Sequence, residues 1–245
     1  MDSALRRSTY LNSKALPTAM ANKQKSRQVP DAFFYVLLGI LVLLSFLKLF
    51  FNRYFFNLFR VFFNTSLRQG QLTDQLLQAR QASVLFNLLF AIIGGVYVYF
   101  LLKHYNWLPA LDVFLIMLLC VISVAAIYFF KFITLKFTGW LTGYTEAVNT
   151  YLFIIFLVNK ILGVLLIPLV IVIAFSPVYI AQVAVIISLL LTAALFLLRF
   201  IRSYNLLHRQ IKVSRFHFFL YIAGIELLPV LLIYKGVVIL LDKNL

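Results

Sequence analysis

Six apolar stretches dominate the chain, and they constrain its fold more than any other feature. Each is long enough to cross a hydrocarbon core of about 30 Å, which requires about 20 helical residues. A chain that enters lipid must satisfy its backbone hydrogen bonds internally, so runs of this length predict transmembrane helices. The six runs are 32–51, 83–102, 113–130, 147–175, 178–198 and 216–234.

The composition also indicates a chain that lies mostly in lipid. The chain is 64% hydrophobic and 12% charged, which excludes an ordinary soluble domain. We therefore predict an all-α, polytopic membrane helical bundle with about six transmembrane helices and one interfacial amphipathic helix. It forms a single domain over residues 31–245. Residues 1–30 are basic and lack an apolar run, so they are not a secretory signal peptide and are better read as a disordered basic tail than as an organelle transit peptide.

The chain carries a formal net charge of +15, with 22 Lys and Arg against 7 acids. These cations lie at the ends of the apolar runs, where anionic lipid headgroups and membrane topology explain them better than nucleic acid does. Their distribution over the short loops places the loops after the odd-numbered runs, including 199–215, in the cytoplasm. The basic tail argues against this orientation, and a re-entrant first run would move the tail inside.

The segment between the first two runs, about 52–67, has a helical period of its own. Its polar face and its apolar face lie opposite each other at 100° per residue. The polar face carries Arg53, Asn57, Arg60, Asn64 and Arg68, and the apolar face carries Phe55, Leu58, Phe59 and Phe62. This pattern predicts a helix along the membrane surface in which Arg53, Arg60 and Arg68 bind lipid headgroups. The alternative is an aromatic extension of the first span that anchors without specific binding.

Two charges lie near the centres of apolar runs, Lys160 in the fourth and Glu226 in the sixth. A lysine at the centre of a membrane helix costs about 2.5 to 3.5 kcal/mol, so it needs a partner or water, and it marks a candidate functional site. We predict that Lys160 pairs with Glu226 on an adjacent helix. The pair is either a structural tie that docks two helices or a site for a proton, an ion or a substrate.

A polar stripe leads to Lys160 along the fourth run. Glu146 and Asn149 share a helix face with Lys160, and Asn159 precedes the lysine, so these residues complete a predicted intramembrane polar site with Glu226. The run is longer than a membrane requires and contains Gly163 and Pro168, which predicts a tilted, kinked or broken helix. Only two residues separate it from the fifth run, so these two helices should be antiparallel neighbours.

Motifs that would indicate an enzyme are missing from the sequence. There is no GxSxG, no CxxC and no phosphate-binding glycine loop, and the acids are too dispersed for a metal site, so we expect no catalytic residues, no metal and no cofactor. Cys120 is a core residue by this interpretation. Gly94 and Gly95 in the second run mark a close helix contact.

Four segments resemble an uncharacterised family of multi-spanning inner-membrane proteins of Bacteroidota, a domain of unknown function. They are FNLFRVFFN, QARQASVLFNLLF, NKILGVLLIPL and HFFLYIAGIELLPVLLIYK. The resemblance covers about 32–241 and implies a helical bundle in a bacterial inner membrane, but it supplies no activity.

Two functions are favoured from the sequence, and a membrane-embedded lipid enzyme is the third and least favoured class, because the sequence lacks clustered acids and a nucleophile. The first is an accessory or assembly component of a bacterial envelope system, and the second is a transporter or channel that uses the Lys160–Glu226 pair for a proton or an anionic substrate. A transporter needs a polar cavity that reaches Lys160, whereas an assembly factor needs a dry core and an exposed apolar surface. The expected partners are anionic lipids, other membrane proteins or a second copy of the chain.

Overall fold

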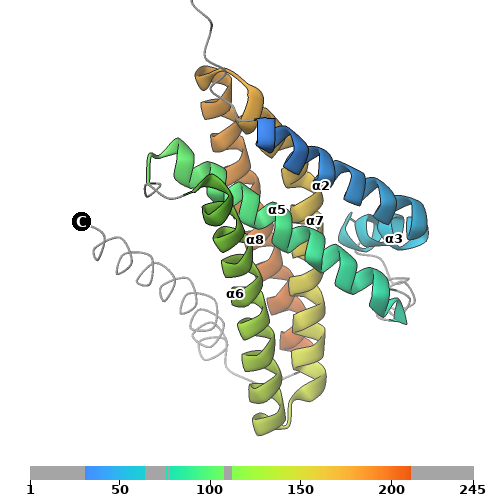
Figure 1. Ribbon diagram of the computed structural model, residues 1–245. Helices are drawn as coiled ribbons and strands as arrows, with labels where there is room; N and C mark the ends of the chain where they lie inside the picture. The colour runs from blue at the N-terminus through green and yellow to red at the C-terminus, as the bar shows by residue number, and fades with distance from the viewer. Residues whose placement is uncertain (1–30, 64–75, 77, 108–111, 211–245) are drawn as a thin grey trace, which may run out of the picture. The chain divides into compact units, whose positions relative to one another are not determined.

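The computed structural model describes residues 31–63, 76, 78–107 and 112–210 of the chain. This described part is all-helical, with six helices and no strand (Figure 1). The helices are α2 (Asp31–Phe50), α3 (Asn52–Phe63), α5 (Arg80–His104), α6 (Val113–Thr142), α7 (Thr145–Phe175) and α8 (Val178–Gln210). The predicted sixth span at 216–234 and the predicted tail at 1–30 lie outside the described residues.

Five of the described helices are long and apolar enough to cross a membrane. The stretches are Phe33–Phe50, Arg80–His104, Val113–Leu141, Thr145–Phe175 and Val178–Ser203. They match the first five predicted runs in order, which confirms the helical membrane-type fold. Four helices continue two residues or more past the runs that predicted them: α5 at both ends, from Arg80 to His104, α6 to Thr142, α8 to Gln210, and α7 at its start from Thr145. Helix formation depends on backbone geometry, so it does not stop where the apolar residues end.

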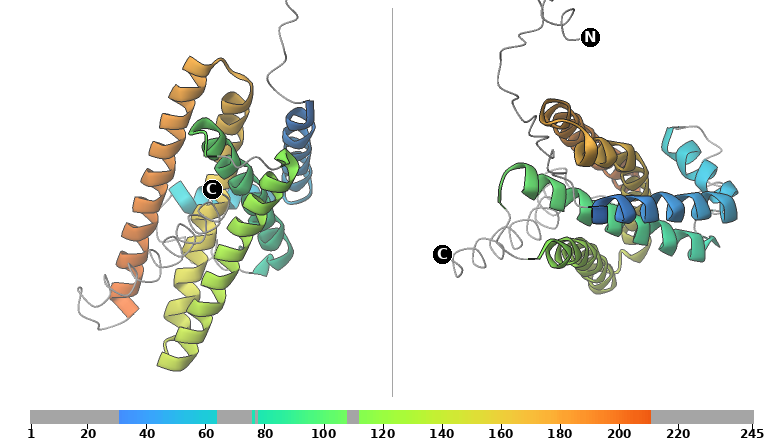
Figure 2. Two further views of the ribbon diagram at one scale, coloured as in Figure 1. Left: turned by 60° about the vertical axis from the view of Figure 1, so that its left-hand side comes forward. Right: turned by 45° about the horizontal axis from the view of Figure 1, so that its top comes forward.

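Helix α7 is the centre of the bundle, because it contacts each of the other five described helices. It runs without interruption through Gly163 and Pro168, so the alternative of a broken helix is excluded. Only Ser176 and Pro177 separate α7 from α8, and the two helices pack along one another (Figure 2). The predicted antiparallel pair is therefore confirmed.

Glycines let the helices approach closely at two levels of the bundle. A Cβ on Gly95 of α5 would overlap the backbone of Val121 in α6, and Gly94 faces Val124 of the same helix. On the other side of α5, a Cβ on Gly163 would lie 3.1 Å from the Cα of Phe90. The predicted helix contact at Gly94 and Gly95 is thus confirmed, and Gly163 provides a second one. Small residues are the usual means of close helix packing in membranes.

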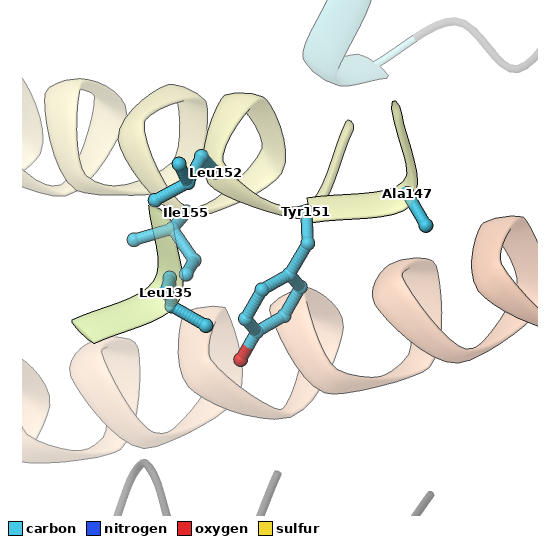
Figure 3. Close-up of a cluster of buried hydrophobic side chains, with 5 residues drawn as sticks. All are labelled: Leu135, Ala147, Tyr151, Leu152 and Ile155. Carbon is cyan, nitrogen blue, oxygen red and sulfur yellow. The ribbon is translucent and has the colours of Figure 1, made fainter. Parts of the chain in front are cut away.

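The chain reverses direction between α6 and α7 at Gly143, which has a φ of +75°. That backbone conformation is easily reached only by glycine, so it ends α6 sharply. Beside the turn, five side chains form a buried apolar cluster (Figure 3). They are Leu135 of α6 and Ala147, Tyr151, Leu152 and Ile155 of α7. This cluster holds α6 and α7 together as one hairpin near the turn.

Helix α3 is separate from α2, with a turn at Phe51 between them (Figure 1). Arg53 and Arg60 are exposed, while Leu58 and Phe62 are buried, as the helical period predicts. Phe55 and Phe59 are only half-buried, and Tyr54 and Val61 are buried in addition. The buried face of α3 is therefore rotated about the helix axis from the predicted apolar face, toward Tyr54. Residues 64–67 of the predicted helix, and Arg68 beyond it, lie outside the described residues.

Candidate functional site

Lys160 is the most buried charge predicted for the site, with a relative exposure of 5%. Its Nζ donates hydrogen bonds to the hydroxyl of Tyr54 at 2.8 Å and to Oγ of Ser83 at 2.7 Å. The three residues come from α7, α3 and α5, and we call them the Lys160 cluster. Hydrogen bonds that involve a charged group contribute about 1.5 to 3 kcal/mol each, so two of them offset a cost of about 2.5 to 3.5 kcal/mol for the buried ammonium.

Both partners of Lys160 in the cluster are neutral hydroxyls. Burial raises the pKa of Tyr54 above its ordinary value, and a hydrogen bond with Ser83 lowers it by less, so the phenol stays protonated at neutral pH. Within the described part of the chain, no carboxylate forms an ion pair with Lys160. The predicted partner Glu226 lies outside the described residues, so their pairing stays a prediction.

The amide of Asn159 is the second buried polar group at this level of α7. Asn159 has no exposed surface, and among the described residues neither its Oδ1 nor its Nδ2 has a hydrogen-bond partner. On α5, Oδ1 of Asn87 is also buried and without a partner in the described part. A buried polar atom without a partner costs about 1 to 3 kcal/mol, so these amides are unfavourable for folding unless something else binds them.

The other two residues of the predicted stripe lie at the exposed start of α7. Glu146 is exposed in the first helical turn, where a carboxylate interacts favourably with the helix dipole. Asn149 is exposed, and its Oδ1 accepts a hydrogen bond from Nζ of Lys136 in α6 at 2.6 Å. Asn149 and Lys160 are about 16 Å apart along the helix axis. The structure brings Lys160 together with Tyr54 and Ser83, and it brings Asn149 together with Lys136.

Apolar side chains fill the interval between these two polar groups. Phe156 packs against Phe132 of α6 with ring centroids 6.1 Å apart, and Ile155 is buried one residue earlier. Phe153 is half-buried on the same face of α7. The described contacts therefore place aromatic side chains along the stripe between its exposed start and Lys160.

A second connection holds α3 at its other end. Nη2 of Arg202 in α8 donates a hydrogen bond to the carbonyl oxygen of Phe62, and the guanidinium lies 4.7 Å from the centroid of the Phe62 ring. The last carbonyls of a helix have no partner within it, and a cation near them is favourable. Arg202 therefore caps α3 from another helix, while Lys160 holds α3 through Tyr54.

Sequence reasoning did not identify Tyr54, Ser83 or Arg202 as members of a site. Tyr54 lies on the buried stripe of α3 with Leu58 and Val61, and its hydroxyl is the one polar tip on that stripe. That position could have identified Tyr54 as a member of the site from the sequence alone. Ser83 is the first residue of the second predicted run and gave no such signal, because its importance comes from a contact with a residue 77 positions away.

Fold and site together describe a bundle of apolar helices, of the kind that suits a membrane protein, in which a buried lysine connects three helices. A model of the family described as domain of unknown function DUF4271 matches residues 33–237, and the chain belongs to this family. No curated protein and no solved structure matches the chain. The family match confirms the part of the resemblance that concerns a domain of unknown function.

Proposed function

We propose that the protein is an integral protein of a bacterial inner membrane, as in Bacteroidota, and that it serves as an accessory or assembly component of an envelope system. The proposal rests on the Lys160 cluster, because its lysine already has hydrogen-bond acceptors within the protein. Lys160 is buried, and its ammonium is held by hydroxyls of α3 and α5. A lysine held in this way supports a role as a structural connection that fixes α3 on the bundle.

Membership of the DUF4271 family over 33–237 and five apolar helices support the membrane location. The exposed Arg53 and Arg60 on α3 support contact with anionic lipid headgroups. On this proposal, the Lys160 cluster and Arg202 hold α3 against the bundle, and the arginines of α3 face the headgroups. Glu226 then provides the carboxylate that balances Lys160 inside the bundle.

A specific observation favours a transporter or channel as the second candidate. Lys160 has no carboxylate partner in the described part, and the buried amide of Asn159 has no hydrogen-bond partner there. A proton or an anionic substrate could bind between these groups in another state of the protein. Purification in a mild detergent separates the two candidates. A protein partner in fixed stoichiometry supports the assembly role, whereas a single monodisperse protein that catalyses transport in vesicles contradicts it.

The proposed orientation has a direct test. The turn between α6 and α7 and the segment 199–215, which begins within α8, should both be cytoplasmic. In a Cys120→Ala background, Tyr144→Cys should resist a membrane-impermeant thiol reagent in intact cells, and Trp107→Cys should react. Both positions are exposed, whereas Ser203 is buried and is a poor place for such a probe. Labelling of Tyr144→Cys with protection of Trp107→Cys would reverse the orientation.

A further inference from the structure

The described part of the chain contains three buried cations, each on a different helix. Lys131 of α6, Lys160 of α7 and Arg199 of α8 have relative exposures of 6%, 5% and 4%. Other parts of the protein therefore cover these charges. A buried charge is unfavourable unless a countercharge or several hydrogen bonds compensate it. Arg199 cannot relieve this cost by deprotonation, because an arginine keeps its proton in proteins.

The chain has too few acids in its apolar parts to neutralise all three cations. Among the described side chains, the carboxylates are those of Asp112 and Glu146, and both are exposed. Of the remaining five of the seven acids, Glu226 alone lies inside an apolar run. One carboxylate neutralises one cation, so two of the three buried cations need another source of negative charge. With Glu226 assigned to Lys160, these two are Lys131 and Arg199.

Lys131 and Arg199 lie at nearly the same height in the bundle. Phe132, the residue after Lys131, contacts Phe156 of α7 with ring centroids 6.1 Å apart, so Lys131 is level with about residue 157. Because α7 and α8 reverse direction at 176–177, Arg199 is level with about residue 154 of α7. The two heights differ by about three helical residues, which is about 5 Å.

The buried apolar cluster beside the α6–α7 turn connects the surroundings of the two cations. The ring of Tyr151 extends from α7 toward α8 (Figure 3), and Phe200, the residue after Arg199, packs against the cluster. Leu135, which belongs to the cluster, lies one turn after Lys131 on the same face of α6. Both cations are therefore next to one contact region that joins α6, α7 and α8.

A buried hydroxyl beside Arg199 adds a hydrogen-bonding group to this region. Ser203 lies one turn after Arg199 on the same face of α8, and only 1% of its surface is exposed. Its Oγ has no hydrogen-bond partner within the ranges that the structure describes. A buried hydroxyl without a partner is unfavourable, so Ser203 is available to donate to a ligand.

We propose that Arg199, Lys131 and Ser203 bind a phosphate group, carried either by an anionic lipid or by a soluble phosphate compound. A guanidinium donates paired hydrogen bonds to phosphate oxygens. A phosphate monoester carries a charge of about −1.5 to −2 at neutral pH, which matches the two cations better than a single carboxylate does. Arg199 begins the segment proposed to be cytoplasmic, and basic pockets between membrane helices on that side bind lipid headgroups.

Thermal unfolding of the full-length protein with added ligands tests this site. The protein is purified in detergent, and phosphorus analysis verifies that lipid has been removed. It is then titrated separately with short-chain phosphatidic acid, short-chain phosphatidylglycerol and inorganic phosphate. We expect at least one of these to raise the thermal midpoint, because a ligand of the native state stabilises it. A response to lipids alone identifies a headgroup as the ligand, and a response to inorganic phosphate identifies a soluble compound.

Substitutions show whether the response comes from this site. The dissociation constant should rise at least about tenfold with Arg199→Gln or Lys131→Gln and about two- to tenfold with Ser203→Ala, which are the losses expected for charged and neutral hydrogen bonds. The matched control is Lys136→Gln, which removes one charge from an exposed position of the same helix as Lys131. It should change the dissociation constant by less than about twofold.

Two results would overturn the inference. The first is a wild-type protein whose thermal midpoint none of the three ligands raises, since its buried cations are then neutralised within the chain. The second is an equal change of the dissociation constant for Lys131→Gln and Lys136→Gln, since the anion then responds only to net charge. Each variant is checked for a monodisperse peak in detergent. If Arg199→Gln does not fold, unchanged dissociation constants for Lys131→Gln and Ser203→Ala also overturn the inference.

Discussion

Helices α6 and α7 have nearly the same length, yet they occupy opposite environments. The most apolar window of α6 is more apolar than that of α7, but α6 is mostly exposed and α7 is mostly buried. In a soluble protein, the more apolar helix would be expected at the centre. In lipid, hydropathy gives no such preference, because lipid tails solvate an apolar side chain as well as a protein interior does.

The residues that distinguish the two helices explain the difference. Within its apolar part, α7 carries Asn159, Lys160 and Gly163, which need hydrogen-bond partners or a close neighbouring backbone. Polar and ionisable residues inside a membrane face the interior of the bundle, because lipid provides them with no partner. In α6, the window 114–126 contains no charge, so it can face lipid without cost. Polar and small residues, rather than hydropathy, therefore select the central helix.

The largest effect should come from the central lysine. If Glu226 provides the countercharge, Lys160→Met leaves a buried carboxylate without a partner and destabilises the fold by about 3 to 5 kcal/mol. Combining it with Glu226→Leu removes both charges and should restore expression. The measurement is the folded yield in detergent and the thermal midpoint of unfolding, with a cellular assay of envelope function in parallel.

The matched control for this prediction lies on α6. Lys136→Met changes the same residue type at an exposed position and should alter stability by less than about 1 kcal/mol. If the double variant restores expression and function together, the charges are structural only. If it restores expression alone, they take part in transport or recognition. Equal losses for Lys160→Met and Lys136→Met would break the contrast between the two helices.

A smaller effect is expected where α7 meets α5. Gly163→Leu introduces a side chain against the backbone of Phe90, which must move, and we expect a loss of about 1 to 3 kcal/mol. Ala126→Leu on α6 introduces the same leucine side chain at an exposed position and should be near neutral. Thermal unfolding of both variants in the same detergent compares them. A stable Gly163→Leu variant would mean that α5 and α7 are less closely packed than the structure describes.

The sequence predicted those parts of the fold that follow from which residues favour lipid and which favour water. Five spans, the separate α3 and the close contact at Gly94 and Gly95 follow from local patterns of apolar, charged and small residues. The helical extensions of α6 and α8 were not predicted, because a search for apolar runs cannot detect a helix that continues into polar surroundings. Hydropathy also could not rank α7 as the central helix, since it weighs each run alone.

The candidate site was predicted only through its charge. Lys160 was found because a lysine in an apolar run is costly wherever its partners are. Its contacts with Tyr54 and Ser83 join residues 106 and 77 positions apart, and such pairs depend on how the helices pack. The stripe from Asn149 to Lys160 follows from helix periodicity, but periodicity does not reveal which neighbouring helix covers each part of the stripe.

The smallest predicted effect concerns Asn159, and its sign is informative. Asn159→Leu keeps the branched shape and the number of side-chain heavy atoms and removes an amide that has no partner among the described residues, so the proposed dry core predicts a gain of about 1 kcal/mol in stability. The control is Ser123→Leu, which removes a hydroxyl at an exposed position of α6. It should change stability little, because no buried polar atom is involved. Thermal unfolding in detergent gives both values. A loss of more than about 1 kcal/mol for Asn159→Leu would show that the amide binds something, and it would favour the transporter over the assembly component, because a bound proton carrier or substrate group would then lie beside Lys160.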